Sequence, residues 1–125
     1  MEIKASNFLN QRFIDAYRSL AEKDNLGIST MSVIKVIKKL SEEHEVFEKT
    51  RLSIFKKYGT LEGEQYVVKA SNLDEKQFED FTKEINDLHE SNINIPIDSK
   101  IKISYKCGLK PVEFILLDEF IEASE

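Results

Sequence analysis

The stretch TMSVIKVIKKLSEEHEVFEKTRLSIFKKYG, residues 30–59, decides the fold of this chain. Neither glycine nor proline occurs in it before Gly59, and Ser29 or Thr30 offers an N-cap. One set of positions recurs at alternating spacings of four and three residues, which is the heptad pattern of a long helix with one packed face. We call these positions the seam: Val33, Ile37, Leu40, His44, Phe47, Arg51, Ile54 and Tyr58.

The predicted helix is long for a chain of 125 residues. The seam spans about 42 Å at 1.5 Å per residue, whereas a globule of this size has a radius of gyration of about 14 Å. We therefore expect part of the helix to project, to pack along the first helix, or to pair with another subunit. Val36 and Phe55 widen the apolar stripe and favour several packing partners over a lone two-stranded coil.

Shorter elements are predicted on both sides of this helix. A first helix is expected over residues 6–22, capped by Ser6 or Asn7 and stopped by residues 24–27. Residues 59–64 are typical of a turn, and residues 66–68 of a short strand. A third helix is expected from Asn72, its N-cap, with Glu75 completing a capping box, to about residues 90–92.

The remaining residues predict two strands and a closing helix. Apolar residues alternate with others over 93–97 (Ile93, Ile95, Ile97) and over 101–105 (Ile101, Ile103, Tyr105). Asp98-Ser99 between the two runs predicts a hairpin with Pro96 at an edge. Pro111 opens a fourth helix that continues through Ile121. The order is ααβαββα, and we predict one α+β domain over residues 1–125, with the long helix packed on other helices and a small antiparallel sheet.

Composition limits the class of protein. Hydrophobic residues make up 41% and charged residues 33%, as in a soluble folded chain. No apolar run approaches the roughly 18 residues of a membrane span, and residues 1–4 do not predict a secretory signal. Cys107 is the single cysteine, which excludes an internal disulfide and suits a reducing compartment.

Charge is distributed unevenly over the chain. The net charge is −5, with +3 over residues 1–58 and −8 over residues 59–125. An acidic chain is a poor candidate for binding phosphate backbones, while the asymmetry suits head-to-tail self-association or a charged protein partner. A basic face of Lys35, Lys38 and Lys39 is a DNA-binding candidate, but Glu42 and Glu43 lie four residues after the last two and favour ion pairs on a solvated helix.

Catalytic patterns are not found in the sequence. The four glycines form no phosphate-binding loop, and neither a zinc-protease motif nor an EF-hand spacing occurs. Nothing beside Cys107 predicts a thiol nucleophile with His44 or His89. Neighbouring acids such as Glu79-Asp80 and Asp118-Glu119 point about 100° apart on a helix and do not form a general acid–base pair. We predict no catalytic, metal or cofactor-binding residue, no cofactor, and no enzyme.

His44 and Arg51 are the seam positions of greatest interest, because a polar group on an apolar seam costs free energy unless it finds a partner. One interpretation places both at the margin of the stripe, with the Arg51 stem lying along it. A second is that they fix pairing with another helix, and a third is a ligand or anion site. The predicted interaction residues are His44, Phe47, Arg51, Ile54 and Tyr58.

The order of segments resembles a group of small uncharacterised proteins from tailed bacteriophages and prophages. The resemblance covers roughly residues 30–122. It rests on the long helix through 47–51 to Tyr58-Gly59, the acidic turn 61–64, the Phe/Glu-rich helix 78–88, a strand pair, and the closing segment 116–121. It implies a phage origin, and transfers no functional residues.

Three functions follow as hypotheses. The first is a non-enzymatic phage-type protein that self-associates through the long helix and binds a phage or host protein, as an accessory to assembly or host takeover. The alternative is a stoichiometric, anti-CRISPR-like inhibitor of a bacterial defence complex whose acidic surface blocks a nucleic-acid-binding site, and a further alternative is a DNA-binding module. We expect a homo-oligomer in the cytoplasm of a bacterial host, or associated with the virion, without membrane or nucleic-acid partners.

Overall fold

The computed structural model describes residues 1–24 and 26–125. It confirms a mixed α+β fold built on one long helix, and the predicted order of elements is roughly correct. Three strands, β1, β2 and β6, are added to that order. The elements are β1 (Glu2–Lys4), η1 (Ala5–Leu9), α1 (Gln11–Ala21), η2 (Gly27–Ser29), α2 (Thr30–Tyr58), β2 (Thr60–Glu62), β3 (Gln65–Val67), η3 (Ala70–Asn72), α3 (Glu75–Glu90), β4 (Asn92–Asn94), β5 (Ile101–Ser104), η4 (Tyr105–Cys107), α4 (Pro111–Leu116) and β6 (Ile121–Ser124), the η elements being 3₁₀ helices.

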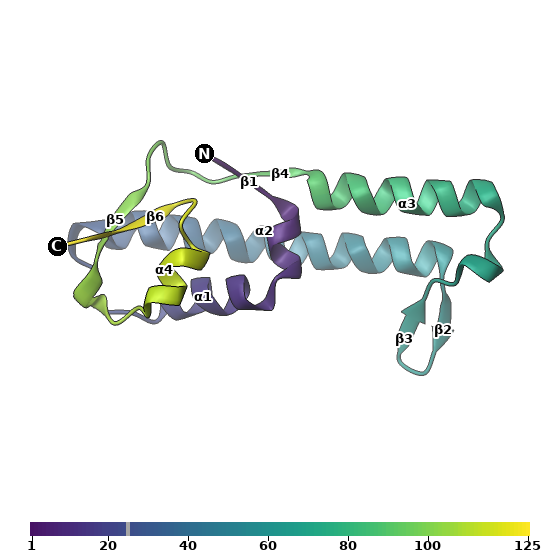
Figure 1. The fold of residues 1–125 in the computed structure, drawn as a ribbon, viewed down its shortest axis with the longest axis horizontal. Helices are drawn as coiled ribbons and strands as arrows, with labels where there is room; N and C mark the ends of the chain where they lie inside the picture. Colours follow the sequence, from purple (N-terminus) through teal and green to yellow (C-terminus); the bar gives the residue numbers. More distant parts are fainter. Residues whose placement is uncertain (25) are drawn as a thin grey trace.

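Helix α2 is the axis of the molecule and runs nearly its full length (Figure 1). Its predicted bounds are confirmed, but the predicted cap chemistry is wrong. The hydroxyl of Ser29 donates to the carbonyl of Lys102 at 2.7 Å, and that of Thr30 donates to Gly27 at 2.7 Å. Neither accepts from the first turn, because the 3₁₀ turn η2 leads directly into the helix.

The core surrounds the first half of α2. Helices α1 and α4 and the pairs β1–β4 and β5–β6 pack there (Figure 1). The side chains of Tyr17, Leu20, Val36, Leu40 and Phe120 are almost completely buried in this cluster. Burial of a large apolar side chain stabilises a fold by about 1.5–3 kcal/mol, so this end holds most of the hydrophobic stabilisation.

The second half of α2 pairs with α3, antiparallel to it (Figure 1), and near its end it also contacts β3. The ring of Phe81 meets those of Phe55 and Tyr58 edge-on, with centroids 5.7 and 5.6 Å away. No residue of α3 is fully buried. This part of the molecule is a thin helical hairpin that extends from the core.

The predicted hairpin of residues 93–97 with 101–105 is wrong. Strand β4 pairs antiparallel with β1, with Ile93 opposite Ile3, and β5 pairs in parallel with β6, with Ile101 opposite Ile121. All four isoleucines are buried in the one core. Alternation indicated correctly that Ile93, Ile95, Ile101 and Ile103 turn inward, but not Tyr105, which lies in η4 and is 54% exposed. It carries no information on which distant segment pairs with each strand.

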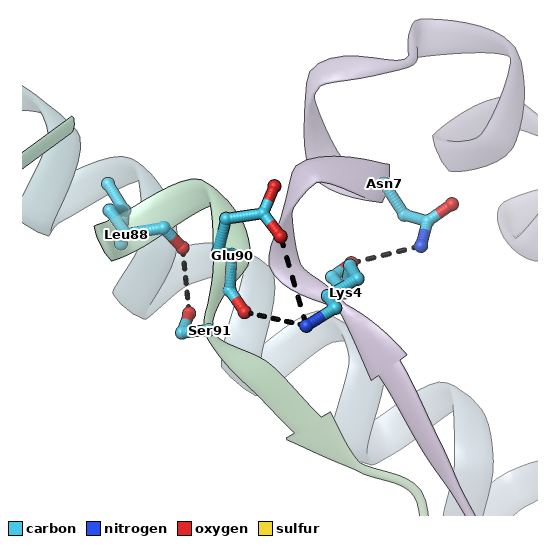
Figure 2. Close-up of polar contacts among 5 residues, drawn as sticks. All are labelled: Lys4, Asn7, Leu88, Glu90 and Ser91. Carbon is cyan, nitrogen blue, oxygen red and sulfur yellow. Dashed lines mark hydrogen bonds and ion pairs between the residues drawn. The ribbon is translucent and has the colours of Figure 1, made fainter. Parts of the chain in front are cut away.

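Polar contacts clamp the β1–β4 junction to the end of α3 (Figure 2). The ammonium of Lys4 donates to the carbonyl of Glu90 at 3.1 Å and lies 3.8 Å from its carboxylate. The hydroxyl of Ser91 donates to the carbonyl of Leu88, and the amide of Asn7 to that of Lys4. A cation at a helix C-terminus offsets the negative end of the dipole, so Lys4 helps to join the helical hairpin to the core.

Two helix starts differ from prediction. The first helix is broken at Asn10, whose side chain accepts from the backbone of Arg12 at 3.0 Å and caps α1. The preceding residues form η1 instead, which leaves Leu9 48% exposed. Helix α3 is capped by Asp74 with Gln77, not by Asn72 with Glu75. In both cases a side chain other than the predicted one accepts from the first turn, and at α3 the side chain of Gln77 accepts in return from the backbone of Asp74.

The predicted turn 59–64 is mostly strand, and the predicted fourth helix is too long. Residues 60–62 form β2, the turn is Gly63-Glu64, and β3 begins one residue before the predicted strand. Helix α4 ends at Leu116. Phe120 and Ile121 belong to the turn and strand that follow, and both are buried. An apolar pair satisfies a buried strand as readily as a helix face.

Candidate binding groove

The seam of α2 faces the chain's own elements. Each seam residue is buried or half-buried within this single chain. The prediction that the helix packs along the first helix is confirmed, and α3 covers the rest. Burial of the seam therefore needs no second subunit.

The five predicted interaction residues are separated by this packing. Phe47 is in the core, where its ring centroid lies 5.6 Å from that of Phe8 and 6.1 Å from that of His89. Ile54 and Tyr58 are half-buried in the half of α2 that pairs with α3. Only His44 and Arg51 reach a groove.

His44 is held between α1 and α2 by three contacts. Its ring stacks on Phe8 with centroids 5.1 Å apart, its Nδ1 is hydrogen-bonded to the hydroxyl of Tyr17 at 3.3 Å, and its Nε2 lies 3.6 Å from the carboxylate of Glu48. Burial raises the pKa of the Tyr17 hydroxyl, while the charge of Arg18 and a hydrogen bond with it oppose that rise. The ring of His44 is thus fixed in one orientation beside Arg18.

Arg51 lies at the margin of the seam, as the first interpretation expected. Its guanidinium is 5.0 Å from the centroid of the Phe55 ring, one turn further along the helix. Within residues 1–24 and 26–125, no carboxylate lies within 4 Å of Arg51 or Arg18. The sequence has three arginines, Arg12 being the other. Two of the three therefore line the same groove without a carboxylate within 4 Å among the described residues.

Two open grooves meet at Glu48 and Arg51. The first, of about 420 Å³, lies between α1 and α2 and includes Leu9, Gln11, Arg18, His44, Glu48 and Arg51. The second, of about 820 Å³, lies between α2 and the β2–β3 hairpin and includes Lys49, Arg51, Leu52, Lys56, Gln65 and Tyr66. Helix α1 and the hairpin extend from the same side of α2, with a stretch of open helix between them (Figure 1). We call the two grooves together the cradle.

The cradle is a positively charged surface on an acidic protein. Arg18, Lys49, Arg51 and Lys56 line it, against Glu48 and Glu64. Lys56 lies 5.6 Å from the centroid of the Tyr66 ring, and Lys49 pairs with Glu45 at 3.0 Å. Cations beside aromatic rings, as Arg51 and Lys56 are, suit recognition of an acidic group.

Gly59 allows the β2–β3 hairpin, which forms one side of the cradle, to pack closely against the end of α2. Its amide donates to the carbonyl of Phe55 at 2.8 Å and ends α2. A Cβ at this position would lie 2.5 Å from the oxygen of Phe55 and 2.9 Å from that of Val67. Only glycine lets β3 approach the helix end so closely.

The basic face on the outer side of α2 has a simpler explanation. Lys35 and Lys38 are exposed, and Lys39 pairs with Glu43 at 2.9 Å, so the predicted i,i+4 pair is confirmed at that position. None of the three lines either groove of the cradle. The structure does not bring these lysines into a concave site.

A second polar cluster joins α2 to α3. Lys57 pairs with Glu84 at 3.0 Å, and a hydrogen bond from Tyr58, followed by one from Lys57, holds the pKa of the Glu84 carboxyl below its usual value. The same contact with Glu84 raises the pKa of Tyr58. The pair of Lys57 with Glu84 Oε1 links α2 to α3, while Glu84 Oε2 is buried without a hydrogen-bond partner among the described residues.

Sequence reasoning missed Arg18, Gln11 and Tyr66 as groove residues. They come from α1 and the hairpin, and only the tertiary fold brings them beside α2. The one sequence feature that could have indicated Arg18 is that the chain has only three arginines, so each one merits attention.

Within residues 1–24 and 26–125, no three His, Cys, Asp or Glu side chains gather as metal ligands. No helix in that part of the chain is long and apolar enough to cross a bilayer. Comparisons with protein-family models, curated proteins and solved structures found no match.

Proposed function

We propose that this chain is a non-enzymatic, phage-type protein that acts by binding proteins, both copies of itself and a phage or host partner. The observation that carries the proposal is the exposure of large apolar side chains on an extended frame. Ile28 is fully exposed, Ile115 is 72% exposed, and Met31 is 63% exposed. Exposed apolar groups that gather on one face mark interaction surfaces more often than catalytic ones.

Three exposed apolar side chains, two of them among those just named, lie close together in the sequence at one end of the molecule. Ile28 lies on η2, and Met31 and Ile34 lie on the first turns of α2. We call them the end face. The open form of the grooves further supports binding of a macromolecule, because small-molecule sites are usually more enclosed.

The resemblance to small phage proteins supplies the biological setting. In that setting the protein is an accessory to phage assembly or host takeover, located in the bacterial cytoplasm or with the virion. This is the context in which the partner is to be sought.

The test is affinity capture from phage-infected bacteria with two matched variants. Ile28→Ser combined with Met31→Ser removes the end face, whereas Lys38→Ser combined with Ser53→Ala changes exposed polar positions on the same helix. We expect a partner that the wild type and the polar control retain and the end-face variant loses. Equal recovery with all three chains, or no specific partner, would contradict the proposal.

A second candidate, inhibition of a bacterial defence complex, is favoured by the charge of α3. This helix carries six acidic residues against two lysines, and Glu79, Asp80 and Asp87 are exposed. Such a surface suits a basic nucleic-acid-binding site. Binding to a basic host nuclease that weakens steeply with salt, and is lost in Asp80→Lys/Asp87→Lys, would support it; binding that salt does not affect would exclude it.

A further inference from the structure

We propose that the cradle binds the acidic C-terminal segment, residues 118–125, of a second copy, so that copies associate head to tail. This inference rests on the proposed self-association and names the two surfaces involved. Three observations carry it: arginines without carboxylate partners in the cradle, an acidic segment that is exposed, and a distance between them that one chain cannot bridge.

The receiving surface is already organised. Arg18 is beside the Tyr17–His44 pair, and Arg51 is positioned over Phe55 at 5.0 Å. Because Arg51 is half-buried and its guanidinium contacts Phe55, part of its side-chain entropy is already lost before a carboxylate binds. Arginine binds carboxylates through two parallel hydrogen bonds, which gives such a contact direction as well as charge.

The entering segment has the matching chemistry. Residues 118–125 contain Asp118, Glu119, Glu122 and Glu125 and no basic residue. All four are exposed, and only Asp118 has a cation nearby, Lys100 at 3.5 Å. Strand β6 pairs with β5 along one edge, and among the described residues no strand covers its other edge. The four carboxylates of the segment are therefore accessible for docking, whereas Phe120 and Ile121 between them are buried in the core.

One chain cannot place this segment in its own cradle. Strand β6 pairs with β5, and the carbonyl of Lys102 on β5 accepts from Ser29 at the start of α2. Arg51 lies about 33 Å further along the same rigid helix. The C-terminus and the β2–β3 hairpin are at opposite ends of the molecule (Figure 1). The two surfaces can meet only between copies.

A head-to-tail contact determines how many copies can assemble. A contact between two different surfaces leaves a free cradle at one end and a free acidic segment at the other. Such heterologous contacts form rings when the rotation closes and filaments when it does not. Association should therefore continue beyond the dimer and should weaken as salt screens the charges.

The experiment is sedimentation velocity on the full chain with charge reversals, at low and at physiological salt. Wild type should associate with increasing concentration. Arg51→Glu and Glu122→Arg should each weaken association at least about tenfold. An equimolar mixture of the two variants should associate again, because each then offers a surface of opposite charge to the other.

Controls separate this result from loss of fold. Lys38→Glu reverses an exposed charge on the outer face of α2 and should associate as wild type does. Arg18→Glu tests the cradle without touching the Arg51–Phe55 contact, and far-ultraviolet circular dichroism checks each chain. Monomeric wild type at all concentrations, or variants that associate unchanged, would overturn the inference. Those outcomes leave capture of a partner by the end face intact, so failure here is distinguishable from failure of the proposed function.

Discussion

The guanidinium of Arg51 lies 5.0 Å from the centroid of the Phe55 ring, and the Phe55 ring makes a T-shaped contact with Phe81 of α3, with ring centroids 5.7 Å apart. One phenylalanine thus supports the groove on one side and the helix pair on the other. Contacts that stabilise the helical hairpin therefore also position the central cation of the cradle.

Phe81→Ala should destabilise the α2–α3 pair. Its ring contacts Phe55 and Tyr58, so truncation removes two edge-on aromatic contacts and leaves a gap. Because the site is half-buried, we expect a loss of about 2 kcal/mol, below the 3–5 kcal/mol typical of full burial. Urea unfolding measures the loss, and hydrogen exchange should rise over residues 75–90.

Phe78→Ala is the matched control for this change. Phe78 is on the same helix but is 45% exposed. Its loss should cost less than about 1 kcal/mol. Equal effects of the two substitutions would mean that Phe81 does not hold the pair together.

Tyr17→Phe should loosen His44. The substitution keeps the buried ring and removes only the hydroxyl bonded to His44 Nδ1 at 3.3 Å. We expect a cost of about 1 kcal/mol and faster motion of the imidazole, measured by urea unfolding and by NMR of its ring protons. Tyr105→Phe, at an exposed tyrosine, should change neither; an unperturbed His44 in Tyr17→Phe would contradict the assignment.

Gly59→Ala should cost more than Gly63→Ala. The added methyl at position 59 meets backbone oxygens of Phe55 and Val67, whereas at position 63 it meets open space and only the positive φ of 63° is unfavourable. We expect about 1 kcal/mol at Gly63 and at least about 2 kcal/mol at Gly59, from thermal unfolding. The reverse ranking would show that the hairpin does not approach the helix end as described.

Stability should fall on acidification because two carboxyl groups have lowered pKa values. For Glu84 the causes are hydrogen bonds from Tyr58 and Lys57. For Glu113 burial acts to raise the pKa, but the bond with Ser19, the backbone of Lys110 and nearby lysine charges outweigh it. A carboxyl with a lowered folded pKa contributes stability above its unfolded value, near 4.5, and loses it as the pH falls through the folded value.

The measurement is urea unfolding of the wild type and of Glu84→Gln and Glu113→Gln between pH 7 and pH 3. Each substitution should flatten the decline below about pH 4.5. Glu79→Gln, at an exposed carboxyl with no ion-pair partner within 4 Å among the described residues, should leave the slope unchanged. Parallel acid profiles for all four chains would refute the assignment.

The long helix could be predicted from sequence because its signal is local. An uninterrupted periodic stretch that ends at Gly59 fixes both bounds of α2. The short strands could not be paired in this way, since β4 and β5 find their partners near the two ends of the chain. Strands of three or four residues carry too little pattern to specify a distant partner.

In the candidate site too, residues with a local sequence signal could be predicted, and residues brought together by the tertiary fold could not. His44 and Arg51 attract attention in the sequence because they interrupt an apolar seam, and both do line the cradle. Phe47, Ile54 and Tyr58 fit the same pattern but are used in packing within the chain. Arg18 and Tyr66 become relevant only when α1 and the hairpin fold beside α2.

The most direct test of the central claim, that this protein works through contacts with other protein chains and first with its own copies, is zero-length carbodiimide cross-linking of an equal mixture of ¹⁴N- and ¹⁵N-labelled chains. We predict mixed-isotope cross-links between Lys49 or Lys56 of one copy and the carboxylates of residues 118–125 of another, found by mass spectrometry and lost in Glu122→Arg. If the mixture yields only cross-links within one isotope at protein concentrations well above micromolar, the account of self-association is contradicted.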